Sequence, residues 1–410
     1  MPTITCSVKD LMALIGKHCS IEQVRSLLES AKGEVESVVG DELTIKFNDT
    51  NQPWLWSVEG VAVLLRGILG VEEGLLSVKL GKPSREVHVE KSVKGVRSFI
   101  AAFIAKGVKV SESMLVQLIQ AQEKIADVFG RKRSKVAIGL YPSRKIEFPV
   151  LYRAVDPRSV RFVPLGYFEE MNLSEIVATH PKGEEYGGAL AGLKKFPVLV
   201  SSSREVLSFP PIINSASLGK VDVGESELFF EVTGTDETAV DLVASIFAMI
   251  FSVRGFSIEP VKIKTGGKSK VTPLITPASW KLPVGAAENV IGVSLSESEK
   301  RSLFRKMRCE YAKGTVLVPS YRDDILHVVD IIEDLAIAYG VDKLEALPLT
   351  ESTIGRESTL IPLIDALREL LVGAGFQESF SQMLSSDDLL YDRMSVQDFG
   401  TVRISNASSS

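Results

Sequence analysis

Residues 319–340 read PSYRDDILHVVDIIEDLAIAYG, and this stretch says the most about how the chain folds. Its apolar residues recur at helical spacing, which predicts an amphipathic helix over Asp324–Tyr339. Asp330, Glu333 and Asp334 stand at i, i+3 and i+4, so they share one side of that helix, and Asp324 lies where the helix begins. Grouped carboxylates repel one another unless something answers their charge. The compensation could come from a divalent cation, from a Lys or Arg of a partner chain, or from solvent water.

The composition is that of a multidomain globular protein. A chain of 410 residues is too long for one typical core, so two to four domains are expected. Apolar residues at 45% and charged residues at 24% are ordinary for this class. The net charge of −5 creates no overall positive field, so no DNA partner is expected. RNA would bind only through a local basic patch or a partner chain.

The cysteines and the apolar runs predict a cytoplasmic protein without membrane contact. Cys6, Cys19 and Cys309 have no metal-like spacing and are too few for a disulfide framework, which indicates a reducing compartment. The start, MPTITCSVKD, lacks a basic segment followed by an apolar run, so no signal peptide is expected. The apolar run over 240–253 is interrupted by Asp241 and two serines and is too short for a span.

Four regions follow one another along the chain, and together they predict an α+β multidomain fold. Residues 33–47, GEVESVVGDELTIKF, predict a hairpin that turns at Gly40-Asp41. The polar segment TGGKSK over 265–270 is typical of a boundary. The expected regions are an N-terminal α+β domain (1–80), a mixed α/β domain (81–265), a small helix-rich α+β domain (266–350) and a last region with a helix over 360–374 followed by the strand-like FQESFSQML and TVRISN (351–410).

No familiar catalytic signature is present in the sequence. The four histidines lie in no GxSxG or Cys-His arrangement, and no zinc, P-loop or dinucleotide motif occurs. Asp324, Asp330, Glu333 and Asp334 supply the oxygen ligands that Mg²⁺ prefers. A solvated acidic first turn that complements the helix dipole is the other interpretation, and both stay open.

Two further places favour binding. Glu231 and Thr233 are two apart on an expected strand and face one way, while Phe230 and Val232 face the other. With the loop SFPPIINS over 208–215 they would line a polar pocket, or else form a solvent-facing strand surface. Chemistry there would have to position a water, because no strong nucleophile is at hand. The run GRKRSK over 130–135, with Arg131, Lys132 and Arg133, would meet phosphate or form a solvated loop.

Six segments in this order resemble the β subunit of archaeal and eukaryotic-type phenylalanyl-tRNA synthetase. They are DTNQPWLWSVEGVAVLLRG (49–67), QEKIADVFGRKRSKVAIGLY (122–141), FVPLGYFEEMNLSEIVATHPKG (162–183), LSFPPIINS (207–215), EVTGTD (231–236) and VPSYRDDILHVVDIIEDLAIAYG (318–340). The resemblance implies an α2β2 heterotetramer in which the α subunit binds ATP and phenylalanine and joins phenylalanine to tRNA(Phe). The β subunit would hydrolyse tyrosine wrongly attached to that tRNA.

The resemblance also implies domain and residue roles. The region 81–265 corresponds to a tRNA-editing domain, and 351–410 corresponds to the start of an antiparallel-sheet, catalytic-like domain without residues for aminoacylation. The family's Mg²⁺ ligands fall on Asp324, Asp330, Glu333 and Asp334. Its editing pocket falls on Leu199, Ser208, Glu231 and Thr233. A polar partner for the tyrosine hydroxyl would reject phenylalanine, which leaves that partner unpaired.

Some residues depart from the family pattern. Glu231 stands where the family usually has Asp, and Tyr141-Pro142 stands where many relatives have His-Asp. Gln52 and Trp54 replace an Arg and an Asp, and Ile125-Ala126 replaces Leu-His. Family members continue beyond residue 410, so the last domain is expected to be incomplete. A free-standing editing or tRNA-binding relative and a non-catalytic scaffold are the alternative functions.

Overall fold

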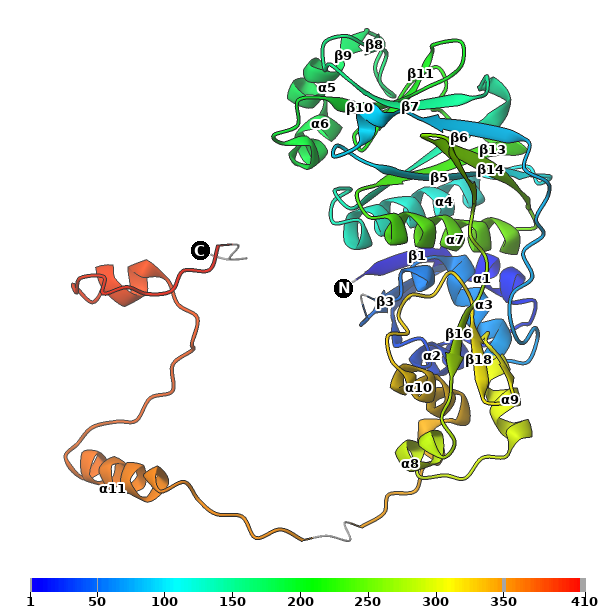
Figure 1. The fold of residues 1–410 in the computed structure, drawn as a ribbon. Helices are drawn as coiled ribbons and strands as arrows, with labels where there is room; N and C mark the ends of the chain where they lie inside the picture. The colour runs from blue at the N-terminus through cyan, green and yellow to red at the C-terminus, as the bar shows by residue number, and fades with distance from the viewer. Residues whose placement is uncertain (1, 50, 349–351, 406–410) are drawn as a thin grey trace. The chain divides into compact units, whose positions relative to one another are not determined.

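A computed structural model describes residues 2–49, 51–348 and 352–405. The chain divides into two units, Met1–Leu344 and Glu345–Ser410, each of which is described by itself. Figure 1 shows the order of the elements along the chain. The expected boundary between residues 350 and 351 and the SNASSS end from residue 406 lie outside the described residues.

A three-stranded antiparallel sheet with helices begins the first unit. The strand order is β1-β3-β2, and the turn of the predicted hairpin is Gly40-Asp41, which confirms the hairpin. Ser7, Ser20 and Ser57 each cap the helix that follows by accepting a backbone N–H bond. The elements are β1 Thr3–Ser7, α1 Val8–Ile15, α2 Ile21–Glu29, β2 Gly33–Val39, β3 Glu42–Phe47, η1 Pro53–Leu55 and α3 Val58–Ile68.

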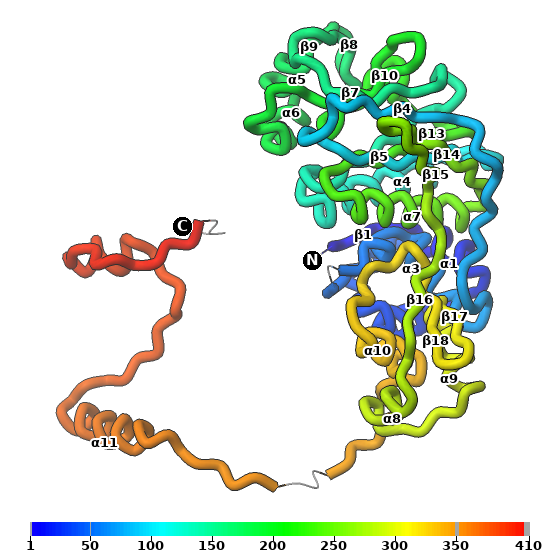
Figure 2. Tube along the Cα trace, viewed as in Figure 1, coloured from blue at the N-terminus to red at the C-terminus, as the bar shows by residue number. Residues whose placement is uncertain are grey.

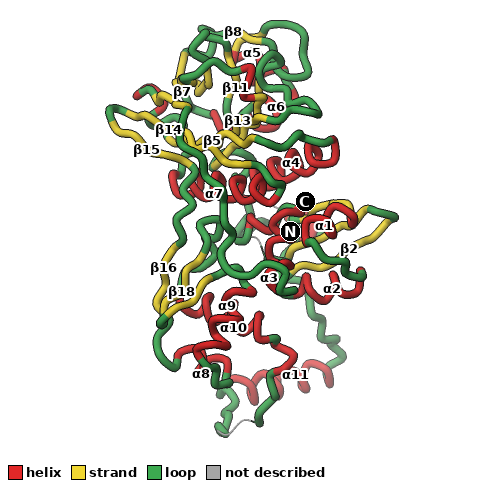
Figure 3. The backbone as a smooth tube through the Cα atoms, turned by 90° about the vertical axis from the view of Figure 1, so that its right-hand side faces the viewer, coloured by secondary structure: helices red, strands yellow, loops and turns green. Residues whose placement is uncertain are grey.

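A large mixed sheet forms the middle of the first unit. Its strands run in the order β12-β11-β10-β7-β4-β14-β5-β13-β6, and β15 pairs with β14 outside this path. The strands are β4 Arg85–Val89, β5 Phe99–Lys106, β6 Val136–Pro142, β7 Val150–Val155, β10 Phe196–Val200, β11 Val206–Phe209, β12 Ile213–Asn214, β13 Glu227–Gly234, β14 Ser257–Thr265 and β15 Lys268–Thr272. The segment TGGKSK is therefore the turn of the β14–β15 hairpin, and its interpretation as a boundary was wrong (Figure 3).

Helices α4 (Glu112–Lys124) and α7 (Glu237–Val253) cover one face of this sheet (Figure 1). Side chains alternate along β5, so Phe103 packs toward these helices while Ile104 packs on the opposite face. The helix-side core continues without a break into α1, α3 and β1, which lie against α7 (Figure 2). The N-terminal sheet and the central sheet therefore share one hydrophobic core.

A buried ion network fastens these two parts together. Arg254, at the end of α7, donates from Nε to Glu59 of α3 at 2.6 Å and from Nη1 and Nη2 to Asp10 of α1 at 2.7 Å each. Glu59 has no solvent exposure. Burial raises the pKa of Glu59, and the charge of Arg254 opposes that rise.

The sheet curves over its second face, so strands from both ends of the strand order enclose a separate core. That core includes Ala102 of β5, Phe229 of β13, Tyr152 of β7, Leu199 of β10 and Leu207 of β11. The segment between β7 and β10 packs against β10 and β11. Its elements are β8 Arg161–Phe162, β9 Met171–Asn172, α5 Leu173–Thr179, α6 Pro181–Tyr186 and η5 Gly187–Leu190. Short helical turns link other strands at η2 Lys91–Val93, η3 Ile125–Phe129 and η4 Ser143–Lys145.

The end of the first unit is a helix-rich region with a three-stranded sheet of order β16-β18-β17. Its elements are β16 Ala278–Lys281, α8 Ala286–Ile291, α9 Glu297–Lys306, β17 Glu310–Ala312, β18 Thr315–Val318, α10 Val328–Tyr339 and η6 Val341–Lys343. Helix α10 begins at Val328 with His327 as its N-cap, four residues later than predicted. Asp324 therefore lies in the preceding loop, because Asp330 bonds to the backbone N–H of His327 and fixes the helix start there.

The second unit contains α11 (Leu360–Gly373) and η7 (Asp388–Asp392). The predicted strands in FQESFSQML and TVRISN are absent from residues 352–405, where the backbone pairs with no neighbouring strand. The apolar side chains of α11 are exposed, including Leu363, Leu367 and Leu370. Across the described ranges of the whole chain, no helix combines the length and the apolar character that crossing a bilayer requires.

Candidate functional site

A cavity of about 180 Å³ opens where the two ends of the central sheet approach each other. Its wall combines β13 and β6, from one end of the strand order, with β11 and the loop that follows it, from the other. The lining residues are Gln122, Glu123, Arg133, Ala137, Ile138, Leu165, Lys182, Ser208–Asn214, Glu231 and Thr233. An apolar protein cavity of about 150 Å³ holds benzene, so this volume suits one aromatic ring.

Glu231 and Thr233 lie on β13 and point into this cavity, as the alternation of the strand predicted. Phe230 and Val232 point the other way, into the core beneath α7. The solvent-facing interpretation of this strand is therefore wrong, because Glu231 and Thr233 are both buried. Strand β13 runs between β5 and β6 as an inner strand, which fixes both side chains on rigid backbone (Figure 1).

One oxygen of the Glu231 carboxylate is bonded and the other is not. Tyr141 Oη donates to Glu231 Oε1 at 2.8 Å and lies 3.3 Å from Asn214 Oδ1, so it links the two ends of the sheet. This bond passes over Gly139, where a Cβ would stand 2.2 Å from Tyr141 Oη. Only glycine leaves room for the Tyr141–Glu231 pair.

Two buried polar atoms of the cavity wall have no hydrogen-bond partner among the described residues. They are Glu231 Oε2 and Ser208 Oγ. A buried unpaired oxygen costs about 1–3 kcal/mol, so such atoms mark a place where a ligand or water completes the bonding. Burial raises the pKa of Glu231 to about 7, and both the bond from Tyr141 and the charge of Arg97 oppose this rise. The carboxyl group therefore changes its protonation state near neutral pH.

Leu199 does not reach the cavity. It lies on β10 directly opposite Ser208 of β11 and packs in the core enclosed by the sheet. The structure thus brings three of the four residues expected for an editing pocket to one cavity, and the fourth, Leu199, is not among the residues that line it. Leu199 supports the strand that carries Ser208.

One residue of the basic run, Arg133, lines the same cavity. It donates from Nη1 to the backbone oxygens of Pro211 at 3.3 Å and Ile212 at 3.0 Å. The guanidinium of Arg133 also sits 4.0 Å from the ring centroid of Tyr186, whose ring has Lys182 Nζ within 5.2 Å. Two cations, Arg133 and Lys182, therefore line the cavity that also contains Glu231 and Thr233.

Arg131, Lys132 and Arg133 are three consecutive left-handed residues, with φ values of 50°, 50° and 61°. A left-handed conformation is unfavourable for residues with a Cβ, so the surrounding bonds must hold it. The N–H of Lys132 bonds to the oxygen of Asp127 at 2.8 Å, and that of Arg133 bonds to Ala126 at 2.9 Å. This tight turn exposes Arg131 and Lys132 and turns Arg133 inward.

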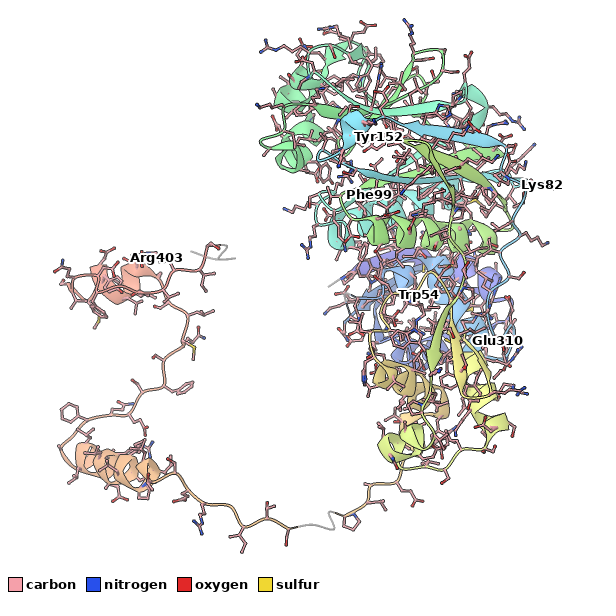
Figure 4. The ribbon with its side chains drawn as sticks, viewed as in Figure 1. Trp54, Lys82, Phe99, Tyr152, Glu310 and Arg403 are labelled. Carbon is pink, nitrogen blue, oxygen red and sulfur yellow. The ribbon has the colours of Figure 1, made fainter. Side chains whose placement is uncertain are left out.

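The four carboxylates of the other predicted site line a cavity of about 50 Å³, together with Trp54, which Figure 4 labels. Arg322 stands between two of them, donating from Nε to Asp324 at 3.1 Å and from Nη2 to Asp334 at 3.3 Å. Glu333 pairs with Lys32 at 3.2 Å. Asp330 Oδ2 accepts the backbone N–H groups of Leu326 and His327, at 2.7 and 2.8 Å.

Arg322 and Lys32 of this chain thus neutralise part of the acidic cluster. This differs from the three sources considered from the sequence, which were a divalent cation, a partner chain and solvent water. Burial raises the pKa of Asp334, and the charge of Arg322 opposes that rise. No group of three or more His, Cys, Asp or Glu residues is arranged to hold a metal ion in the ranges that the structure describes. In this arrangement the Arg322 guanidinium supplies positive charge beside Asp324 and Asp334, and Lys32 supplies it beside Glu333.

Two residues that bond to polar side chains of the first cavity were not predicted as site residues. Tyr141 was noted only as a departure from the family, although its hydroxyl donates a hydrogen bond to Glu231. Arg97 was not noted at all, and it bonds to Thr233 from a different part of the chain. The sequence offered one indication of this role, because Arg97 stands just before the apolar strand FIAAFIAK. An arginine beside a buried strand needs hydrogen bonds in the core.

Comparison with known proteins gives concordant results. Residues 280–341 match the family described as "tRNA synthetase B5 domain". The chain is 36% identical to the phenylalanine–tRNA ligase beta subunit of Thermococcus kodakarensis, over 97% of this chain and 70% of that one. It is also 36% identical to the beta subunit of Pyrococcus furiosus, over 100% of this chain and 75% of that one.

A solved structure agrees with the fold. The crystal structure of an N-terminal fragment of the phenylalanyl-tRNA synthetase beta-subunit from Pyrococcus horikoshii superposes with a TM-score of 0.79 at 37% identity. The match covers 83% of this chain and all of that fragment. The chain therefore belongs to the family of phenylalanine–tRNA ligase beta subunits.

Proposed function

We propose that this subunit removes tyrosine from mischarged tRNA(Phe), in a cytoplasmic α2β2 ligase whose α subunit binds ATP and attaches phenylalanine. The observation that carries the proposal is the pair of unpaired oxygens, Glu231 Oε2 and Ser208 Oγ, inside a cavity that suits one aromatic ring. Tyrosine and phenylalanine differ by one hydroxyl. A buried acceptor for that hydroxyl favours tyrosine, because phenylalanine leaves the acceptor unpaired.

The chain's residues divide the work between recognition and positioning. Ile138, Phe209 and Ile212 offer an apolar wall to the ring, while Glu231, Ser208 and Thr233 offer polar atoms to its hydroxyl. The described lining contains no cysteine or histidine that would act as a nucleophile or a base. Hydrolysis would then depend on a water held beside the ester carbon, with the terminal ribose hydroxyl of the tRNA assisting.

Thr233→Ala tests this proposal. We expect the assembled ligase with this change to hydrolyse tyrosyl-tRNA about fivefold more slowly, because a hydrogen bond of about 1 kcal/mol is lost from the cavity wall. The measurement is the release of tyrosine from preformed tyrosyl-tRNA. Thr235→Ala is the matched control, since Thr235 is exposed just beyond the strand. Equal rates for both variants and the wild type would remove Thr233 from the site.

The exposed cations of the basic run are proposed to contact tRNA phosphate. Replacing Arg131 and Lys132 by Gln is expected to weaken tRNA binding and to lower its salt slope, by about 0.7 for each phosphate that is no longer neutralised. Binding titrations at several salt concentrations measure this slope. Lys194→Gln with Lys195→Gln is the control, because it removes two adjacent exposed cations elsewhere. An unchanged slope would assign Arg131 and Lys132 to a solvated loop.

The expected Mg²⁺ at Asp324, Asp330, Glu333 and Asp334 remains a prediction, and no step of the reaction is assigned to it. Asp330→Ala with Glu333→Ala is predicted to weaken magnesium-dependent association with the α subunit by about tenfold or more. Association is measured with and without chelator. Asp342→Ala with Glu345→Ala, which removes two exposed carboxylates nearby, is the control. Equal association of the wild-type subunits with and without chelator would contradict the predicted Mg²⁺ site.

A further inference from the structure

Arg97 is a buried cation that contacts no acidic side chain among the described residues. It lies between η2 and β5, and only 3% of its surface is exposed. Its three nitrogen atoms all donate, from Nε to Thr233 Oγ1 at 3.0 Å, from Nη2 to Thr233 O at 2.7 Å and from Nη1 to Ser134 O at 3.2 Å. Burying a charged group costs free energy unless hydrogen bonds compensate for it. A buried arginine without an ionic partner therefore suggests a specific role for that residue.

The bonds of Arg97 decide how Thr233 can act. A guanidinium only donates, so Thr233 Oγ1 accepts from Arg97 and its own hydroxyl proton is left for another acceptor. The second bond holds the backbone oxygen of the same residue, so both ends of Thr233 are fixed. Thr233 lines the cavity and therefore presents a donor there.

The backbone around Arg97 is also held. Tyr152 of β7, which Figure 4 labels, donates from Oη to the backbone oxygen of Arg97 at 2.7 Å. Arg97 is thereby tied to β7, to β13 and to the loop at Ser134. A guanidinium anchored on three sides can keep a neighbouring hydroxyl in one orientation.

The charge of Arg97 acts on Glu231, two residues before Thr233 on the same face. Burial lowers the pKa of Arg97 to about 10, so the guanidinium stays ionised at neutral pH. Its charge lowers the pKa of Glu231, which burial raises. The other charged or titratable groups near this carboxyl are Tyr141, which donates to it, and Glu123, Arg133 and Lys182, which line the same cavity.

We propose that Arg97 is a positioning residue of the editing cavity, which fixes the Thr233 hydroxyl as a hydrogen-bond donor and places a positive charge near Glu231. The substrate's tyrosine hydroxyl then donates to Glu231 Oε2 and accepts from Thr233. The two side chains stand two residues apart on one face of β13 and line the same cavity, so one ligand hydroxyl can approach both. This inference rests on the proposed hydrolysis of tyrosyl-tRNA.

Arg97→Met and Arg97→Lys in the assembled ligase test the inference through the rate and the pH profile of tyrosyl-tRNA hydrolysis. Arg97→Met is expected to slow hydrolysis about tenfold or more and to move the pH midpoint upward by about one unit, because the cation that favours the carboxylate is gone. Arg97→Lys keeps the charge but not the planar fork, so the rate falls while the midpoint stays. Arg144→Met, an exposed arginine beside β13, is the control and should change neither.

The outcomes separate this inference from the proposed function. A folded Arg97→Met variant with the wild-type rate and midpoint overturns the role of Arg97, provided that Glu231→Ala has lost hydrolysis. If Glu231→Ala also keeps full hydrolysis, the proposed function itself fails. Should Arg97→Met unfold, as urea titration would show, Arg97→Lys decides alone, and a wild-type rate in that variant overturns the positioning role.

Discussion

Glu231→Ala is expected to slow the hydrolysis of tyrosyl-tRNA by about 100-fold, because a hydrogen bond to a charged group contributes about 1.5–3 kcal/mol. Hydrolysis of phenylalanyl-tRNA, which offers no hydroxyl to this carboxylate, is expected to change little. Glu227→Ala is the matched control, since Glu227 lies on the same strand at the end away from the cavity. Rates for Glu231→Ala within twofold of the wild type would refute the pocket assignment.

The same carboxylate predicts the pH dependence of the reaction. The pKa of Glu231 is raised by burial to about 7. The population of the deprotonated carboxylate, which accepts a hydrogen bond from tyrosine, therefore increases as the pH rises through that value. Tyrosyl-tRNA hydrolysis is therefore expected to rise across neutral pH in the wild type. Glu231→Gln has no such group and should show no step there. A step that persists in Glu231→Gln would belong to another residue.

Glu231 is also expected to lower the stability of the fold at the pH where it works. Its folded-state pKa lies above the unfolded value of 4.5, so the folded state binds the proton more tightly and loses stability as the pH rises from 4.5 to 7. The loss amounts to up to about 3 kcal/mol by that difference. Glu231→Gln should thus unfold at a higher urea concentration than the wild type at pH 8 and match it at pH 4.

Arg254→Met is expected to lower the free energy of unfolding of the first unit by about 3–5 kcal/mol. The change leaves Glu59 buried and Asp10 partly buried without the guanidinium that bonds to both. Urea titration followed by circular dichroism measures the loss. Arg161→Met, which breaks the half-exposed pair with Glu175, is the control and should cost less than about 1 kcal/mol.

A combined variant identifies the cause. Arg254→Met with Glu59→Gln and Asp10→Asn removes the whole ion network, so no uncompensated charge stays in the interface between α7, α1 and α3. Most of the stability is expected to return. If the combined variant is as unstable as Arg254→Met alone, packing of the long arginine side chain, rather than charge, stabilises this interface.

Local pattern predicted those parts of the fold that local physics controls. The alternation of ELFFEVTG placed Glu231 and Thr233 on the face opposite Phe230, as the structure has them, because successive side chains on a strand point to opposite faces. The Gly40-Asp41 hairpin followed from turn chemistry in the same way.

The failures have identifiable physical reasons. TGGKSK has the composition of a linker, but the same glycines suit a tight turn, and only the pairing of β15 with β14 distinguishes the two. Helix α10 starts at Val328 because Asp330 caps the N–H of His327, and a cap of this kind competes with helical pattern upstream. Strand-like sequence after residue 375 forms no strand within the described residues, because a strand needs a neighbour to pair with.

In the candidate site, too, local sequence predicted some features, while contacts between distant residues decided others. The spacing of Glu231 and Thr233 gave their shared strand face, and a polar pocket with the Ser208 loop was one of two interpretations of the residues. The resemblance added the role of an editing pocket. Arg97 stands more than a hundred residues from Thr233 in sequence, and no periodicity connects them. The same holds for Lys32 and Glu333, whose pairing answers part of the acidic cluster with a charge of this chain.

The amino-acid sequence by itself determined the family, the order of the elements and the faces of single strands and helices, since each depends on neighbours within a few positions. Only the tertiary structure decided that the ends of the curved sheet meet around a cavity, that Arg97 and Tyr141 bond to its polar residues, and that Arg322 occupies the acidic cluster. These contacts join residues far apart in the chain. They depend on how the strands curve and pack, and no short stretch of sequence encodes that.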